Sequence, residues 1–153
     1  MVIPTMADSL SPAELVRRIL AAYERADLAP LLDLIDEDIV WKSAFGADSG
    51  VRFGGEYRGR AGVLEAVSQL AMSVVFRRFR PREMVSEGEI VWCLVDAEIA
   101  PIRAPHRGVR RDAAVRCRIH DGRILEIQTF FDTAALRDRV QSAAQPRPVE
   151  PVS

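Results

Sequence analysis

The sequence predicts a domain of the α+β class, with helices in its N-terminal half and a sheet built mainly from its C-terminal half. Three observations predict it. Apolar residues repeat at helical spacing in three stretches before Phe76, and after it they alternate with polar residues, as strands do. An aspartate, Asp132, then follows the last strand pattern and begins a short final helix.

Size and charge limit the classes of partner. The 153 residues suffice for one hydrophobic core, and 48% apolar with 28% charged residues is typical of a folded protein. We expect a flexible segment at 1–10, a single domain at 11–142 and a disordered, proline-containing tail at 143–153. The formal net charge of -1 gives no electrostatic reason to expect a nucleic acid or a membrane as a partner.

Cysteine and histidine positions bear on metals and on the compartment. Cys93 and Cys117 fall within strand patterns, without the spacing of a metal knuckle or the density of a disulfide scaffold. We interpret them as reduced core thiols of a cytoplasmic protein, since the N-terminal residues also lack a signal-peptide pattern. His106 and His120 are isolated, so the sequence predicts no metal site, and no motif predicts a cofactor.

The helices of the first half are predicted from caps and apolar spacing. Ser11, Pro12 and Glu14 form a capping box with proline at the first helical position, and this helix is expected to end near Asp27. Asp27 can cap a short second helix that contains Pro30 and turns inward Leu31, Leu34 and Ile35. A strand over 38–42, a glycine-rich loop over 43–59 and a third helix from about residue 60 to 74 follow.

The strand predicted over 89–99 is the most informative part of the second half. All its odd-numbered residues from 91 to 99 are apolar, and its even-numbered face carries Ile90, Trp92, Leu94, Asp96 and Glu98. Because both faces are largely apolar, we expect helices to cover one and a second subunit of a homodimer to cover the other. Strands over 109–120 and 123–131 form a hairpin across Asp121-Gly122, and Asp132 caps a last helix over 133–142.

Two segments carry a family resemblance: the turn with Gly55, Tyr57 and Gly59 that leads to Val63, and the stretch from Asp121 to Asp132. In them the chain resembles the SnoaL-like branch of the nuclear-transport-factor-2-like superfamily, over about residues 11–142. The resemblance implies a cone-shaped α+β barrel, in which three helices pack on a strongly curved, mostly antiparallel sheet with a short C-terminal helix. It also implies a small-molecule cavity inside the cone and dimerisation through the sheet.

Asp96 and Glu98 are the first candidates for catalysis, because they share the even-numbered strand face with Trp92. If that face lines the cavity, burial and mutual repulsion raise their pKa values toward neutrality, which suits proton transfer. Arg111 lies on the apolar face of the next strand and could pair with either acid. The alternatives are that Asp96 is a structural carboxylate paired with an arginine, and that Arg111 extends into solvent.

Aromatic residues provide the ligand-binding candidates. Trp41, Phe45, Phe53 and Tyr57 cluster around the loop expected at the cavity rim, where rings can bind an apolar ligand. Tyr23, on the first helix, could point its phenol into the cone or equally be a core tyrosine whose hydroxyl is satisfied. Core packing is the alternative for each of these residues.

Resemblance to two groups of the superfamily adds three further candidates. Relative to the ketosteroid isomerases, Ser43 stands at the position of the general-base aspartate and Val115 at that of the oxyanion-hole acid. Relative to the limonene-type epoxide hydrolases, Asp96 matches one acid but Thr129 stands in place of the other. These departures argue against both reactions.

The leading hypothesis is a protein that binds a small, largely apolar molecule in the cavity. Whether it is an enzyme stays open: Asp96 would be the acid or base of an isomerisation, cyclisation or dehydration. The alternative is a non-catalytic ligand-binding or dimerisation module. A cavity bordered by Trp41, Tyr57, Asp96 and Arg111 favours the first reading, and one closed by Phe and Leu side chains favours the second.

Overall fold

The structure, a computed structural model, describes residues 10–144. The flexible segment expected at 1–10 and the tail expected at 143–153 lie almost wholly outside that range. In chain order the elements are α1 (Pro12–Arg25), the 3₁₀ helix η2 (Ala29–Leu34), β1 (Ile35–Lys42), β2 (Glu56–Arg58), α2 (Gly59–Ser73), β3 (Val74–Glu87), β4 (Ile90–Pro101), the 3₁₀ helix η3 (Pro105–Arg107), β5 (Val109–His120), β6 (Arg123–Phe130) and α3 (Thr133–Ala144).

Side-chain caps set the start of the first and last helices. The Ser11 hydroxyl accepts a hydrogen bond from the Glu14 amide at 3.2 Å, and Pro12 occupies the first turn of α1, as the capping box predicts. The Asp132 carboxylate accepts from the Ala135 amide at 3.1 Å at the start of α3. Helix α3 then continues to Ala144, two residues beyond its predicted end.

The second predicted helix is shorter and tighter than expected. Asp27 accepts a hydrogen bond from the Ala29 amide at 3.0 Å, but the following turn is a 3₁₀ helix and not an α-helix. Ile35, expected on the inward face of that helix, is instead the first residue of β1, which begins three residues before its predicted start. Because Ile35 is fully buried in β1, its inward orientation is as predicted while its element is not.

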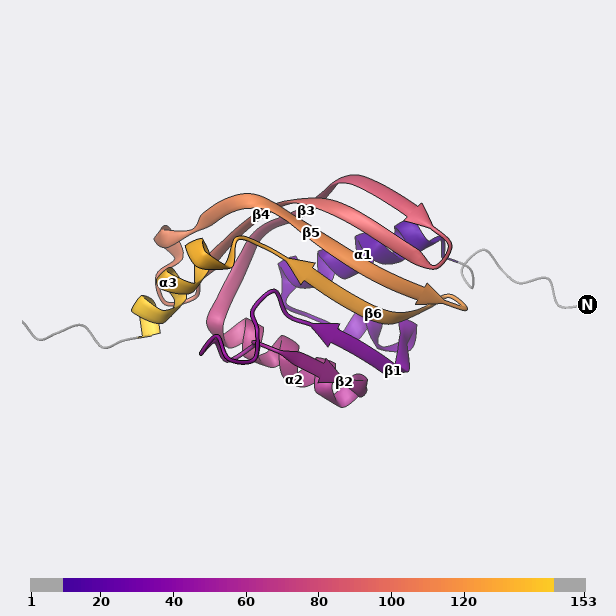
Figure 1. Cartoon of the computed structure of the whole chain (residues 1–153), viewed down its shortest axis with the longest axis horizontal. Helices are drawn as coiled ribbons and strands as arrows, with labels where there is room; N and C mark the ends of the chain where they lie inside the picture. The colour runs from indigo at the N-terminus through magenta and orange to yellow at the C-terminus, as the bar shows by residue number, and fades with distance from the viewer. Residues whose placement is uncertain (1–9, 145–153) are drawn as a thin grey trace, which may run out of the picture.

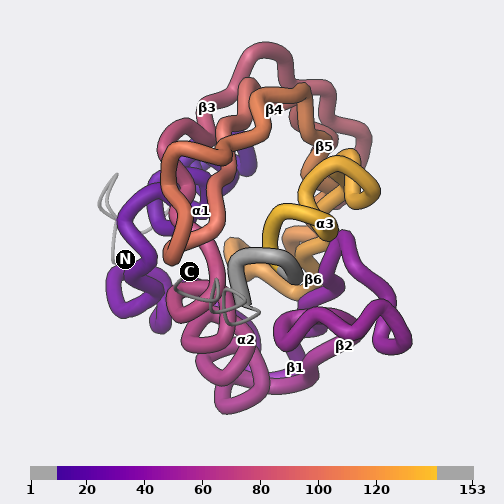
Figure 2. Tube along the Cα trace, turned by 90° about the vertical axis from the view of Figure 1, so that its left-hand side faces the viewer, coloured from indigo at the N-terminus to yellow at the C-terminus, as the bar shows by residue number. Residues whose placement is uncertain are grey.

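One six-stranded sheet carries the fold, in the order β2-β1-β6-β5-β4-β3. All neighbouring strands are antiparallel except β1 and β6, which run parallel. The sheet curves strongly, and Figure 2 shows the strands and helices in a ring, with α1 and α2 on the side that the sheet leaves open (Figure 1, Figure 2). The predicted α+β class with a curved, mostly antiparallel sheet is therefore confirmed.

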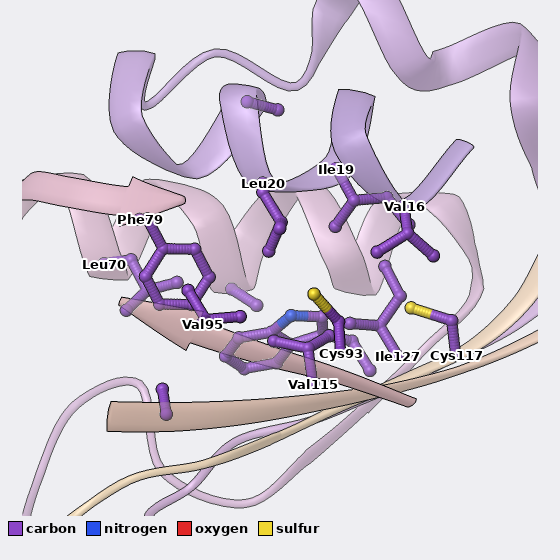
Figure 3. Packing of buried hydrophobic residues seen from close by; sticks show 14 of the residues in the cluster. Val16, Ile19, Leu20, Leu70, Phe79, Cys93, Val95, Val115, Cys117 and Ile127 are labelled. Atoms are coloured by element: carbon purple, nitrogen blue, oxygen red, sulfur yellow. The ribbon is translucent and has the colours of Figure 1, made fainter. Parts of the chain in front are cut away.

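The inner face of the sheet packs on α1 and α2 to form the core. On β4 and β5 the inward residues are the odd-numbered ones, including Cys93, Val95, Val115 and Cys117, each at most 1% exposed. Figure 3 shows these side chains directed toward Val16, Ile19 and Leu20 of α1. Both cysteines are free and buried, as the sequence predicts.

The outer face of the sheet has no covering element within residues 10–144, and large apolar side chains lie exposed on it. Trp92 is 44% exposed and Phe130 is 42% exposed, and their rings stack with centroids 5.8 Å apart. Arg116, the register partner of Trp92, lies on the same face and pairs with Glu126 at 2.9 Å. The even-numbered face of β4 is therefore the outer face, which decides where the predicted catalytic acids lie.

Candidate functional site

Two adjoining narrow cavities lie between the helices and the inner face of the sheet. Each has a volume of about 30 Å³, room for about one or two water molecules. The side chains common to both linings, which form the wall between the cavities, are Tyr23, Trp41, Leu70, Val74 and Phe76.

The first, which we call the helix cavity, extends between α1, η2 and α2. Beyond the common wall, its lining residues are Ile19, Ala22, Ala26, Leu28, Leu31, Val63, Val67, Ala71 and Ile127. All of these are apolar. The amphipathic faces predicted for the first and third helices therefore form most of this cavity.

The second, which we call the aromatic cavity, lies toward α3 and the loop between β1 and β2. Beyond the common wall, its lining residues are Ser43, Ala44, Phe45, Phe53, Ile99, Thr129, Phe131 and Leu136. Phe45 and Phe53 pack edge to face with ring centroids 5.3 Å apart. Among the sequence-predicted ligand-binding residues, Tyr23, Trp41, Ser43, Phe45, Phe53 and Thr129 all border this space.

The principal polar groups of the aromatic cavity belong to Tyr23, Trp41 and Thr129. The Trp41 indole Nε1–H donates a hydrogen bond to the Tyr23 hydroxyl at 2.7 Å. The Thr129 hydroxyl lies close enough to Tyr23 to lower its pKa, but no hydrogen bond of good geometry joins them, and Thr129 Oγ1 is buried without a partner. Such an orphaned hydroxyl is uncommon in folded proteins and calls for an explanation.

Regular elements hold these three groups in place. Tyr23 follows Ile19 by one turn of α1, so both lie on its inward face. Trp41 pairs with Ile127 across the parallel β1–β6 ladder, and Thr129 shares the inward face of β6 with Ile127. Strand parity and helical phase therefore bring the three groups together from three separate elements.

Burial keeps the Tyr23 phenol protonated. Loss of solvent raises the pKa of Tyr23 to about 12, an effect that the nearby Thr129 and Trp41 side chains only partly oppose. At neutral pH Tyr23 is consequently an uncharged hydroxyl. Among the described residues that line either cavity, Tyr23 is the only one with an ionisable side chain.

Asp96 does not face the interior, so the expectation that it lines the cavity is wrong. Its carboxylate lies on the outer face of β4, paired with Arg78 of β3 and, at 3.3 Å, with Arg110 of β5. Arg78 chiefly, with a contribution from Arg110, holds the pKa of Asp96 below its usual value, although partial burial opposes the shift. This is the reverse of the raised pKa expected for a cavity acid, and it matches the structural alternative.

Glu98 and Arg111 depart from the expected arrangement in related ways. Glu98 lies on the same outer face as Asp96, between Arg78 and Arg110 in the strand register. Arg111 has the parity of the inner face, but near the start of β5 its side chain is 56% exposed and pairs with Asp132 at 3.7 Å. Asp96 and Arg111 border a shallow polar depression on the outer face, not the interior.

Two further candidates lie beside the cavities without lining them. Tyr57 packs edge to face on Trp41, with centroids 5.6 Å apart, and its hydroxyl donates to the Arg52 carbonyl at 3.1 Å. Val115 points inward and is fully buried, paired with Thr129 across β5 and β6. Both therefore support residues of the cavity wall, and neither is placed to touch a ligand in these spaces.

Sequence reasoning missed Phe76, Phe131 and Leu136 as lining residues. Phe76 packs edge to face on Tyr23 at 5.3 Å, at the start of β3. Phe131 and Leu136 flank the Asp132 cap at the two positions of a hydrophobic staple, a pattern visible in the sequence. That pattern could have placed the start of α3 against the interior.

The described residues also bear on metals and membranes. Within residues 10–144 no three histidine, cysteine, aspartate or glutamate side chains gather in a metal-binding arrangement. No helix in this range is long and apolar enough to span a membrane.

Comparison with known proteins gives the family and the fold. The sequence model of the SnoaL-like domain matches residues 16–127, whereas a search of curated proteins gives no match. A nuclear-transport-factor-2-like protein of unknown function from Burkholderia pseudomallei has a TM-score of 0.72 at 21% identity, over 84% of this chain and 95% of its own. A similar protein from Burkholderia xenovorans has a TM-score of 0.70 at 23% identity, over 84% and 94%.

A third similar structure was solved with a small molecule. The protein TerC, co-crystallised with polyporic acid, has a TM-score of 0.70 at 20% identity, over 84% of this chain and 97% of its own. At these identities the structural likeness shows the fold alone.

Replacing Thr129 by valine should leave stability unchanged or raise the free energy of unfolding by about 1 kcal/mol, since it removes a buried hydroxyl that has no partner. Urea unfolding measures this, with Thr129→Ser as the hydroxyl-retaining control. A clear loss of stability in the valine variant would show that Thr129 makes a hydrogen bond in the native protein.

The lowered pKa of Asp96 predicts a pH-dependent contribution to stability. A carboxyl whose folded pKa lies below its unfolded value of about 3.9 stabilises the fold above that value, and the contribution disappears as the pH falls through the folded pKa. Asp96→Asn should therefore unfold at lower urea concentration than the wild type at pH 7, and the gap should narrow below about pH 4.

Arg78→Gln should also unfold at lower urea concentration than the wild type at pH 7, because it removes the main partner of Asp96. This difference from the wild type should likewise narrow below about pH 4. A gap between wild type and Asp96→Asn that stays constant from pH 7 to pH 3 would contradict the ion-pair account.

Proposed function

The chain belongs to the SnoaL-like domain family, and we propose on this basis that it binds a small, uncharged, largely apolar molecule in the helix and aromatic cavities. The observation that carries the proposal is the composition of the two linings. Apolar side chains make up almost all of them, and their polar groups are limited to Tyr23, Trp41, Ser43 and Thr129. Such a surface favours transfer of an apolar ligand from water and disfavours a charged one.

Side-chain rotation at the common wall would join the two cavities. Leu70 and Phe76 border both spaces, and Phe76 is only partly buried at the start of β3. A change of rotamer at these two positions would therefore merge the cavities without moving the backbone. The co-crystallisation of TerC with polyporic acid supports a small-molecule role for this fold.

Binding is favoured over proton-transfer catalysis by a carboxylate. No aspartate, glutamate, histidine or lysine is among the described lining residues of either cavity, and Asp96 is engaged by arginines on the outer face. General acid–base catalysis needs a titrating group within hydrogen-bond reach of the reacting atom. We therefore propose the non-catalytic ligand-binding role, with the phenol of Tyr23 as a polar contact.

We also propose that two copies associate through the outer face of the sheet in the cytoplasm. The stacked Trp92 and Phe130 rings form an exposed apolar centre, and the ion pairs of Arg116 and Glu126 form part of a polar rim, an arrangement typical of protein interfaces. The buried, free thiols of Cys93 and Cys117 suit a reducing compartment, and cell fractionation tests that location.

Toluene is a suitable small, neutral probe for the cavities. In NMR titrations it should cause saturable shifts of the backbone amides around Tyr23, Leu70 and Phe76. Ala71→Leu, which fills the helix cavity, should weaken binding by roughly tenfold, whereas Leu64→Ala on the exposed side of α2 should not. Absence of saturable shifts in the wild type, or equal binding by the Ala71→Leu variant, would refute the ligand-binding role.

Trp92→Asp should convert the dimer to a monomer, because it places a charge in the apolar centre of the proposed interface. Sedimentation equilibrium measures the mass, with Met72→Lys as the control, since Met72 is 53% exposed on α2, away from the outer face. A monomeric wild type, or a Trp92→Asp variant that remains dimeric, would rule out this interface.

A further inference from the structure

We propose that the ligand carries an uncharged carbonyl oxygen that is held between the hydroxyl groups of Tyr23 and Thr129. This inference rests on the proposed ligand-binding function and narrows it to neutral carbonyl compounds with an apolar body. Its basis is the unequal use of the polar atoms in the aromatic cavity: some are already paired, and those of Tyr23 and Thr129 are only partly so.

The Tyr23 hydroxyl has one unused function. Its oxygen already accepts a hydrogen bond from the Trp41 indole at 2.7 Å, so what remains to be satisfied is its own proton. A hydroxyl that accepts a hydrogen bond becomes a better donor, because hydrogen bonds in series polarise one another. Since its pKa of about 12 keeps this proton in place at neutral pH, Tyr23 is a permanent donor.

The Thr129 hydroxyl lies near that of Tyr23 but has no hydrogen-bond partner in good geometry. It is buried and lines the aromatic cavity. Ser43, the other hydroxyl of this cavity, differs because its oxygen accepts from the Phe45 amide at 3.1 Å. Tyr23 and Thr129 are therefore the pair that a ligand in this cavity would satisfy.

A carbonyl oxygen matches this pair better than other oxygen groups. It offers two lone pairs, and Tyr23 and Thr129 can each donate one proton to it. A carboxylate would bring a charge into a lining that holds no arginine or lysine among its described residues. An alcohol would bring a proton of its own, so only one of the two protein hydroxyls could donate to it.

The residues that line the two cavities indicate where the rest of the ligand would lie. Tyr23 borders both cavities, whereas Thr129 borders only the aromatic cavity. With the two cavities merged by rotation of Leu70 and Phe76, and with the ligand's oxygen between the two hydroxyls, the body of the ligand would lie against the rings of Phe45, Phe53 and Phe131. These rings provide apolar contact without competing for the oxygen.

A pair of isosteric probes tests the inference. Cyclohexanone and methylenecyclohexane differ in having an oxygen or a CH₂ group at the same position, and NMR titration gives the dissociation constant of each with wild type, Thr129→Val and Tyr23→Phe. We expect each substitution to weaken cyclohexanone binding about five- to tenfold, the effect of one lost hydrogen bond. The binding of methylenecyclohexane should be unchanged or tighter.

The outcomes separate this inference from the broader proposal. Equal effects of the substitutions on both probes, or no effect on either, would overturn the carbonyl site and leave the ligand-binding function standing. Failure of both probes to bind the wild type would overturn the two together. Tyr23→Phe also leaves the Trp41 indole without an acceptor, so Thr129→Val, which keeps the shape of the side chain, decides the question if the phenylalanine variant does not fold.

Discussion

Period-two alternation along β4 and β5 decides which side chains lie inside this fold and which lie outside. The odd-numbered residues of β4 from Val91 to Ile99 are apolar and at most 4% exposed beneath α1. The even-numbered residues include Asp96 and Glu98, and the Asp96 carboxylate pairs laterally with arginines of the two neighbouring strands. The same parity that completes the core therefore removes the carboxylates of this strand from the interior.

The described residues that line the two cavities include no carboxylate, which limits the acid–base chemistry that these spaces can support. The helices and the sheet enclose two narrow, almost wholly apolar spaces, and the hydrogen bond from Trp41 to Tyr23 is the principal polar contact between them. That bond fixes the phenol at the wall common to both cavities, with the Thr129 hydroxyl nearby. Selective recognition of a neutral oxygen follows from such an arrangement more directly than proton abstraction does.

Local patterns predicted most of the fold, because caps and apolar spacing act over a few residues. The Ser11 and Asp132 caps and the hairpin at Asp121-Gly122 lie where the sequence places them. The hydroxyl of Tyr23 and the indole of Trp41, both candidates from the sequence, meet in a hydrogen bond at the wall between the cavities. The short second helix is present as the 3₁₀ helix Ala29–Leu34, but Ile35, expected on its inward face, belongs to β1.

The position of Asp96 shows where pattern reasoning failed. Trp92 and Leu94 made the even-numbered face of β4 resemble a cavity lining, although its odd-numbered face was wholly apolar and the better candidate for the interior. Long-range pairing with Arg78 and Arg110 depends on strand order, which one strand alone does not reveal. Thr129 entered the candidates through resemblance, and its lack of a hydrogen-bond partner became visible only in three dimensions.

The two faces of β4 can be distinguished by the reactivity of the native thiols. Cys93 lies on the inner face of β4 and Cys117 on the inner face of β5, and both are buried. Neither should react with a water-soluble thiol reagent in the native protein at neutral pH, and both should react once the chain is unfolded in urea. Labelling of either cysteine in the native protein, at the rate of an exposed thiol, would show that this parity faces solvent and would contradict the account.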